Sequence, residues 1–257
     1  QALDAFTTSN KNTAIGSFSQ TSKTSGDENT SVGYQTLYNL TTGHWNTVVG
    51  SQAGYMLVDG QRNVFIGQWA GRYETNSYNT YLGYEAGRGN SSGNASNTHN
   101  VGIGYQALYL ARTAGNNVAI GTLAGTNMDE GDDNVLLGSN AGLAINDGSK
   151  NVLIGRQAGN SISTGNSNIA IGYQALYLEN TGTYAVAIGY RSGYKTRLSA
   201  QNENVFIGAN AGRENTDGND NVYVGFGAGY GQSGENPNSN VAIGNYALYN
   251  ARNNENV

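Results

Sequence analysis

One short pattern of polar and apolar positions recurs along the whole chain. Each copy reads Asn, then Val, Thr or Ile, any residue, then Ile, Val or Leu, and finally Gly, as in residues 117–121. Successive motif glycines are 16 to 21 residues apart, most often 17. A fixed period of this length is the signature of a solenoid. The fourteen motif glycines are Gly16, Gly33, Gly50, Gly67, Gly83, Gly104, Gly121, Gly138, Gly155, Gly172, Gly189, Gly208, Gly225 and Gly244.

The spacing inside each copy predicts a short strand. Val118 and Ile120 are two positions apart, so they share one face of a strand. The glycine that follows ends the strand because it adopts positive φ freely. Glycines every few residues each cost about 1 kcal/mol in a helix interior, which argues against a helix. We therefore expect an all-β parallel β-solenoid of about 14 coils of 16–21 residues, each with two short strands and two turns.

We expect residues 1–257 to form a single array. The chain begins and ends inside a repeat, which indicates a fragment of a longer fibrous chain.

The same alternation leads to an assignment of inside and outside. We expect the paired positions, from Thr13 and Ile15 to Val241 and Ile243, to fill the interior together with a small residue three after each motif glycine. The residue at the strand centre would then face outward. An outward apolar stripe marks a contact surface, so we predict a chain–chain interface in a symmetric ring of identical chains. Its residues are Val48, Phe65, Tyr81, Leu136, Leu153, Phe206 and Tyr223.

Two further repeats accompany the motif. Asn opens thirteen of the fourteen copies, with Ala185 as the exception. We expect the aligned Asn side chains to bond both neighbouring backbone and each other. In addition, Leu replaces the usual Gly four residues after the motif glycine at Leu37, Leu108, Leu176 and Leu248, at spacings of 71, 68 and 72. Four coils thus form a super-repeat for which the sequence gives no physical reason.

Composition argues against several functions. Charged residues make up only 12% of the chain, and the net charge is −5, so a surface that tracks nucleic-acid phosphates is not expected. No apolar run is long enough to span a bilayer. There is no Cys and hence no disulfide. An ice-binding solenoid needs a flat exposed Thr array, and the assignment above turns Thr13, Thr30, Thr47 and Thr80 inward.

Candidate chemistry is sparse. His44 and His99 are 55 residues apart, and no converging partners are evident for catalysis or zinc. The acidic run 129–133 lacks calcium-binding spacing. We therefore predict no catalytic residue, no metal site, no cofactor and no enzymatic activity. A polysaccharide-cleaving spike would need paired carboxylates about 5–10 Å apart, whereas the acidic residues here are scattered in turns.

Seven of the eighteen tyrosines occupy one repeat position. A row of exposed aromatic rings can stack on sugars, which makes these residues candidate glycan contacts. Alternatively, they pack over the next coil or line the chain–chain interface. The seven are Tyr38, Tyr55, Tyr109, Tyr177, Tyr194, Tyr230 and Tyr249.

The motif resembles a known family of repeats. Asn-Val-Ala-Ile-Gly at 117–121 and 240–244, and Asn-Ile-Ala-Ile-Gly-Tyr-Gln-Ala-Leu at 168–176, resemble the head repeats of YadA-like trimeric autotransporter adhesins. They are equally similar to repeats of bacteriophage tail fibres. The resemblance implies a left-handed β-roll, a side-by-side homotrimer, and a place outside the cell, on its surface or on a virion. The adhesin repeats are shorter, so the turns here must be larger.

These observations favour a structural or adhesive segment of an extracellular or virion fibre. Its expected partners are other copies of itself and a host-surface glycan or protein. The alternative is a glycan-binding module that uses the tyrosine row and the inserted loops, and a polysaccharide-cleaving spike is a weaker third reading.

Overall fold

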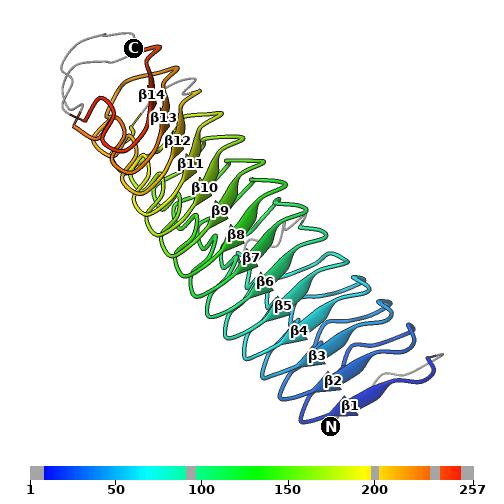
Figure 1. The fold of residues 1–257 in the computed structure, drawn as a ribbon. Coiled ribbons are helices and arrows are strands. Elements are labelled where there is room, and N and C mark those ends of the chain that lie inside the picture. The colour runs from blue at the N-terminus through cyan, green and yellow to red at the C-terminus, as the bar shows by residue number, and fades with distance from the viewer. Residues whose placement is uncertain (1–8, 91–96, 198–202, 232–237, 250–257) are drawn as a thin grey trace. The chain divides into compact units, whose positions relative to one another are not determined.

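The computed structural model describes residues 9–90, 97–197, 203–231 and 238–249. Within these ranges the chain is all-β, without helix, and each coil contributes one three-residue strand (Figure 1). The strands are β1 (Thr13–Ile15), β2 (Thr30–Val32), β3 (Thr47–Val49), β4 (Val64–Ile66), β5 (Thr80–Leu82), β6 (Val101–Ile103), β7 (Val118–Ile120), β8 (Val135–Leu137), β9 (Val152–Ile154), β10 (Ile169–Ile171), β11 (Val186–Ile188), β12 (Val205–Ile207), β13 (Val222–Val224) and β14 (Val241–Ile243).

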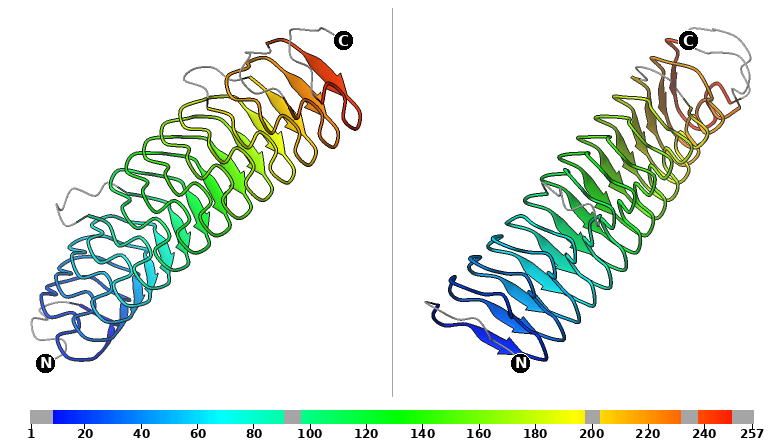
Figure 2. Two further views of the ribbon diagram at one scale, coloured as in Figure 1. Left: turned by 90° about the vertical axis from the view of Figure 1, so that its left-hand side faces the viewer. Right: turned by 180° about the vertical axis from the view of Figure 1, so that it is seen from behind.

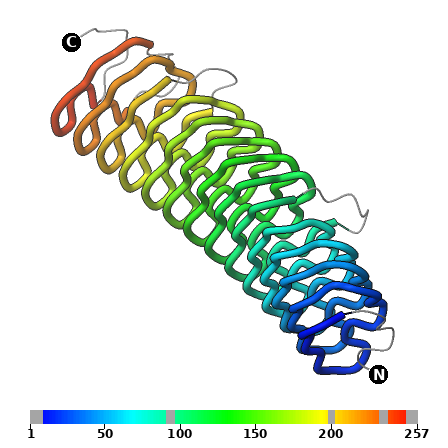
Figure 3. The backbone as a smooth tube through the Cα atoms, turned by 90° about the vertical axis from the view of Figure 1, so that its right-hand side faces the viewer, coloured from blue at the N-terminus to red at the C-terminus, as the bar shows by residue number. Residues whose placement is uncertain are grey.

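The chain divides into two units, Gln1–Gly131 and Asp132–Val257. Strands β1 to β7 pair in parallel and in chain order in the first unit, and β8 to β14 do so in the second. Equivalent repeat positions face each other, as Val64 and Thr80 do. Within each unit the strands lie on one side of their coils, and wider turns complete the coils (Figures 2 and 3). The predicted parallel β-solenoid is confirmed.

The prediction of two strands per coil is wrong for the described residues. Outside the named strands the coils consist almost entirely of turns and bends. Residues with left-handed backbone conformation occur at three places in each coil. In the coil of Gly50 they are Trp45 (φ 58°), Gln52 (φ 54°) and Gly54 (φ 59°). The turns nevertheless pair between coils, since the Gln52 N–H donates to the Tyr34 oxygen at 2.8 Å.

The motif glycine is required by the close approach of the next coil. Gly50 has φ 137°, and a Cβ placed on it would lie 2.3 Å from the carbonyl oxygen of Gly67. Real Cβ atoms do not approach an oxygen this closely, and the backbone conformation is one that L side chains rarely adopt. This contact explains why glycine recurs at the end of every strand.

The predicted assignment of inside and outside is inverted. The strand-centre residues Val48, Phe65, Tyr81, Leu136, Leu153, Phe206 and Tyr223 are all fully buried inside their own chain. The flanking positions are the outward ones, with Ile66 37% and Ile207 38% exposed. Alternation shows that two positions share a face but does not say which face is inside. The chain–chain interface predicted for these seven residues is therefore wrong, whereas the small inward residues, such as Ala53 and Ala70, are buried as expected.

Complementary volumes inside each coil explain the four-coil super-repeat. A Cβ on Gly71 would lie 2.7 Å from the Phe65 ring, and one on Gly87 would lie 2.3 Å from the Tyr81 ring. A large strand centre therefore requires glycine four residues after the motif glycine. Where that residue is leucine, the strand centre is small. The pairs are Ser31 with Leu37, Gly102 with Leu108, Ala170 with Leu176, and Ala242 with Leu248.

Leucine at this position also fills space above the next coil. The Leu176 Cδ2 atom would lie 2.9 Å from a Cβ on Gly193. Leu176 therefore occupies space in its own coil, where the strand centre is Ala170, and in the next coil, where the strand centre is Ala187. The two coils after these have the large centres Phe206 and Tyr223. Close packing of the interior produces a repeat of two smaller and two larger centres.

The opening asparagines form the predicted ladder. The Asn46 N–H and Nδ2 both donate to Asn29 Oδ1, at 3.0 and 2.9 Å, and Nδ2 also donates to the Gly60 oxygen at 2.8 Å. These asparagines are buried, so their hydrogen bonds satisfy polar groups that water cannot reach. Ala185 has no side-chain amide, so of these ladder bonds it makes only the one from its backbone N–H, which donates to Asn168 Oδ1 at 3.0 Å.

Glu74 is a buried carboxyl seven residues after its motif glycine, a position that Leu57 and Met128 fill in other coils. Its Oε1 accepts the N–H groups of Thr75 and Asn76, at 3.0 and 3.2 Å. Burial nevertheless raises the pKa of Glu74 above its ordinary value, and these hydrogen bonds act in the opposite sense. A raised pKa means that the folded chain favours the protonated acid, so stability falls as pH rises through that pKa.

Replacing Asn46 with Ala is expected to cost about 3 kcal/mol of unfolding free energy. The change removes the amide and leaves the Gly60 oxygen and the Asn63 N–H without their partners. Urea denaturation followed by circular dichroism measures the loss. Asn127→Ala, at an exposed turn position, is the matched control and should change stability by less than about 0.5 kcal/mol. Equal effects of the two changes would refute the ladder's contribution.

The volume rule predicts strong coupling between Phe65 and Gly71. Phe65→Ala alone leaves a cavity and should cost about 3–5 kcal/mol, and Gly71→Leu alone should overpack the interior. In the double variant the introduced leucine side chain occupies the space that the ring vacates, so the loss should be smaller than the sum by more than about 1 kcal/mol. Urea titrations of the four proteins measure this coupling, and strictly additive losses would contradict the rule.

Glu74→Gln is expected to stabilise the protein at pH 8 by about 1 kcal/mol or more, because it removes the charge that burial disfavours. The gain should shrink as pH falls, since the acid becomes protonated. Thermal melts between pH 4 and 8 measure both effects. Asp59→Asn, at an exposed position, is the control and should change stability at pH 8 by less than about 0.5 kcal/mol. A variant less stable than wild type at pH 8 would contradict the prediction.

Candidate interaction surface

The outward face of the sheet carries two columns of uncharged side chains. The first and third positions of the fourteen strands are all Thr, Val, Ile or Leu, and none of these residues is buried. Among the Val, Ile and Leu residues, the most exposed are Ile15 (58%) and Leu82 (41%) in the first unit, and Val241 (45%) and Ile243 (71%) in the second. In each unit these columns differ from scattered apolar exposure, which makes them a candidate contact surface.

Aromatic residues border these columns on the side that follows the strand. The Tyr84 and Tyr105 rings stack at 5.6 Å between centroids, and Tyr173 and Tyr190 stack at 5.4 Å. Tyr105 is 48% exposed. Each of these tyrosines directly follows a motif glycine, so the position is set by the repeat.

Aromatic residues also occur on the side that precedes the strand. Trp45 is 45% and Tyr78 is 42% exposed. The Arg62 guanidinium carbon lies 4.3 Å from the Trp45 ring centroid, and its Nη1 donates to the Tyr78 hydroxyl at 2.9 Å. Aromatic residues and arginine are the types enriched where proteins contact each other.

The exposure of the outward threonines overturns one argument against ice binding. Thr13, Thr30 and Thr47 are exposed, so the reason given above for excluding a Thr array is wrong. Thr80 is also on the outward column, but Val64 interrupts the series and the later coils carry Val or Ile there. The threonine array is thus confined to the first five coils.

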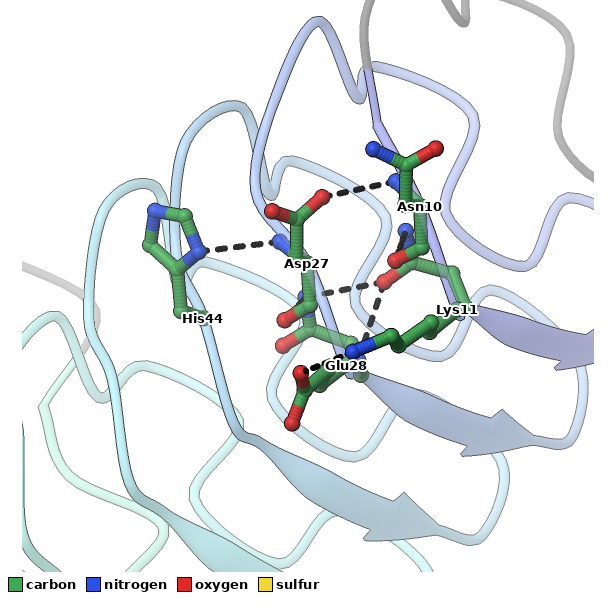
Figure 4. A network of polar contacts seen from close by, with 7 residues as sticks. Asn10, Lys11, Asp27, Glu28 and His44 are labelled. Carbon is green, nitrogen blue, oxygen red and sulfur yellow. Dashed lines mark hydrogen bonds and ion pairs between the residues drawn. The ribbon is translucent and has the colours of Figure 1, made fainter.

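In the first three coils, the turns that precede the strands are linked by hydrogen bonds from backbone N–H groups to side-chain acceptors (Figure 4). Asp27 Oδ1 accepts the Asn10 N–H at 2.6 Å, and His44 Nδ1 accepts the Asp27 N–H at 2.9 Å. Lys11 and Glu28 form an exposed ion pair at 3.0 Å. Because His44 Nδ1 accepts a hydrogen bond, it carries no proton in this arrangement. His44 therefore contributes to the stacking of the coils.

The structure does not bring the two histidines or the acidic run into one site. His99 stacks on Tyr78 at 4.8 Å, whereas His44 lies beside Trp45. Arg112 pairs with Asp129 at 2.7 Å and with Glu130 at 2.9 Å. Among the described residues, no group of three or more His, Asp or Glu side chains is arranged to hold a metal ion.

The tyrosine row predicted from the sequence exists, but its ring faces cover each other. Tyr38 and Tyr55 stack at 5.2 Å, Tyr177 and Tyr194 at 5.2 Å, and Tyr230 and Tyr249 at 4.9 Å, with interplanar angles of at most 16°. Sugar stacking needs an open ring face, and in these half-buried pairs each ring has one face covered by its partner. Glycan contact by Tyr109 and the other row members stays a prediction.

Sequence reasoning missed the arginines of the same row. Arg72, Arg88 and Arg213 also stand five residues after a motif glycine. Arg88 lies 5.1 Å from the Tyr109 ring centroid, and Arg213 lies 5.3 Å from that of Tyr230. Aligning all residue types at this position, instead of tyrosines alone, would have revealed the mixed row.

Comparisons with known proteins identify no relative. No protein-family model, no curated protein and no solved structure matches the chain. In the described part of the chain, no helix is long and apolar enough to cross a membrane.

Proposed function

We propose that this chain is a structural, adhesive segment of a fibre whose copies associate side by side through the outward sheet face. The observation that carries the proposal is the pair of exposed Thr, Val, Ile and Leu columns. Every coil adds the same contact, so the length of the fibre and the strength of the association both increase with the number of repeats.

The size of the apolar face is sufficient for association. Seven coils at roughly 4.8 Å each give columns roughly 30 Å long in a unit. Burying one half-exposed Val or Ile contributes about 1 kcal/mol. The fourteen column residues of a unit therefore contribute on the order of 10 kcal/mol, which is comparable with the about 4–15 kcal/mol that association costs.

Three copies around one axis are the arrangement we favour. Each unit has one apolar sheet face, and a closed ring covers that face on every copy with identical contacts. The number three, the left-handed sense of coiling and the extracellular, cell-surface or virion location come from the resemblance to trimeric adhesins and tail fibres. Catalysis, cofactors and nucleic acid have no part in this proposal.

Light scattering on the purified chain tests the proposal. The expected mass is three times 27.0 kDa. The double variant Ile66→Lys and Ile207→Lys is expected to have the mass of one chain, because it places a charge on the outward columns of both units. Both side chains are exposed in a single chain, so circular dichroism should show an unchanged fold.

A matched control places the same charges elsewhere. Asn127→Lys with Thr164→Lys changes two exposed turn residues and should keep the wild-type mass. A wild-type mass of 27.0 kDa, or a column variant that keeps the trimer mass, would overturn the proposed side-by-side association.

A further inference from the structure

Each unit contains one arginine held among three aromatic rings. In the first unit the Arg72 guanidinium carbon lies 6.0, 5.2 and 5.1 Å from the ring centroids of Tyr55, Trp69 and Tyr73. We call this group of four residues the first cation–aromatic cluster. The arrangement attracts the cation to the ring faces and limits its movement.

The second cation–aromatic cluster has the same composition in the other unit, with tyrosine in place of the tryptophan. The Arg191 guanidinium carbon lies 5.9, 5.2 and 5.4 Å from the ring centroids of Tyr173, Tyr190 and Tyr194. Tyr190 is 47% exposed, so the cluster is open to solvent. The two arginines stand at different positions of the repeat, Arg72 five and Arg191 two residues after the motif glycine, so different side chains place a guanidinium among three rings in each unit.

The charges of these two arginines are not neutralised by the described residues. Arg72 forms no ion pair there, and its Nε is shielded from solvent without an acceptor. Arg191 donates one bond, from Nε to Gln174 Oε1 at 2.8 Å, which leaves its terminal nitrogens available. By contrast, Arg88 lies 3.4 Å from Glu85 and Arg213 lies 3.7 Å from Glu214. A rigid guanidinium with free in-plane donors matches a carboxylate or sulfate.

Each cluster includes one member of the tyrosine row, Tyr55 in the first and Tyr194 in the second. Tyr38 stacks on Tyr55, and Tyr177 stacks on Tyr194, both at 5.2 Å. Stacking covers one face of each ring, whereas the hydroxyls stay available to contact a ligand. Among the described residues none of these four hydroxyls makes a hydrogen bond. A ligand rich in hydroxyl groups complements them.

We infer that each cation–aromatic cluster binds an acidic polysaccharide, with a carboxylate or sulfate on the arginine and sugar hydroxyls on the tyrosines. Nucleic-acid bases stack on ring faces, and here each tyrosine pair covers one face of both its rings. An acidic peptide gains affinity by pairing with free backbone, but the N–H of Met56 already donates to Arg72 at 2.9 Å, and that of Lys195 to Arg213 at 3.0 Å. The inference does not depend on the proposed side-by-side association.

Calorimetric titration with polygalacturonate and with dextran sulfate tests the inference, and neutral dextran serves as the uncharged comparison. The wild-type chain is expected to bind both acidic polymers, more weakly as salt increases, and not to bind dextran. The double variant Arg72→Gln and Arg191→Gln should bind at least about tenfold more weakly, since each cluster loses its guanidinium–anion contact.

The control is Arg156→Gln with Arg197→Gln. It removes the same charge from exposed arginines that make no cation–aromatic contact among the described residues, and its affinity should stay within about twofold of wild type. Equal weakening by both double variants would show general charge attraction and overturn the inference. Tighter binding of polyglutamate than of either polysaccharide, or binding of neutral dextran unaffected by the arginine changes, would also overturn it. Light scattering on each variant reports the association state separately, so a failed inference leaves the proposed fibre unaffected.

Discussion

In-register hydrogen bonding between equivalent positions of successive coils is the constraint on which this structure depends. A strand of three residues has too few bonds to be stable alone, and each coil is therefore ordered by its neighbours. The constraint acts on side chains as well as on backbone. Asn46 bonds the Asn of the preceding coil and the turn of the following one, and Gly50 leaves room for the carbonyl of Gly67. The recurring residues of the motif are those whose chemistry the stacking itself requires.

The remaining positions separate interior from surface. Strand centres such as Phe65 pack against glycine inside the coil, while their neighbours such as Ile66 face outward. A coil with one strand must close its interior with turn residues, including small alanines and the residue seven after the motif glycine. This arrangement leaves the outward side of the sheet in each unit free for the proposed association. The sheet face suits another copy of the chain, and the cation–aromatic clusters suit an anionic polymer.

The sequence was sufficient to predict the solenoid, the strand positions and the asparagine ladder, because all three follow from the period and from the chemistry of Asn and Gly. It was not sufficient to orient the strands. Val118 and Ile120 share a face in either orientation, and apolar character alone favoured the wrong one. Pairing Phe65 with Gly71 and Ala170 with Leu176 would have indicated which residues share the interior, since volume compensation requires contact. The clusters around Arg72 and Arg191 depend on the paths of the turns, which the spacing of the motif does not determine.

Volume compensation also limits how an array of this kind can change in length. Some coils combine a small strand centre with leucine four residues after the motif glycine, and others combine a large strand centre with glycine there. Neighbouring coils are therefore not interchangeable. Deleting one coil would place a large centre beneath a leucine, or leave a gap where a leucine had filled the space. Deleting or duplicating four coils restores every contact. Variation in the length of this array is therefore expected in blocks of about 70 residues, as the leucine spacings of 71, 68 and 72 indicate.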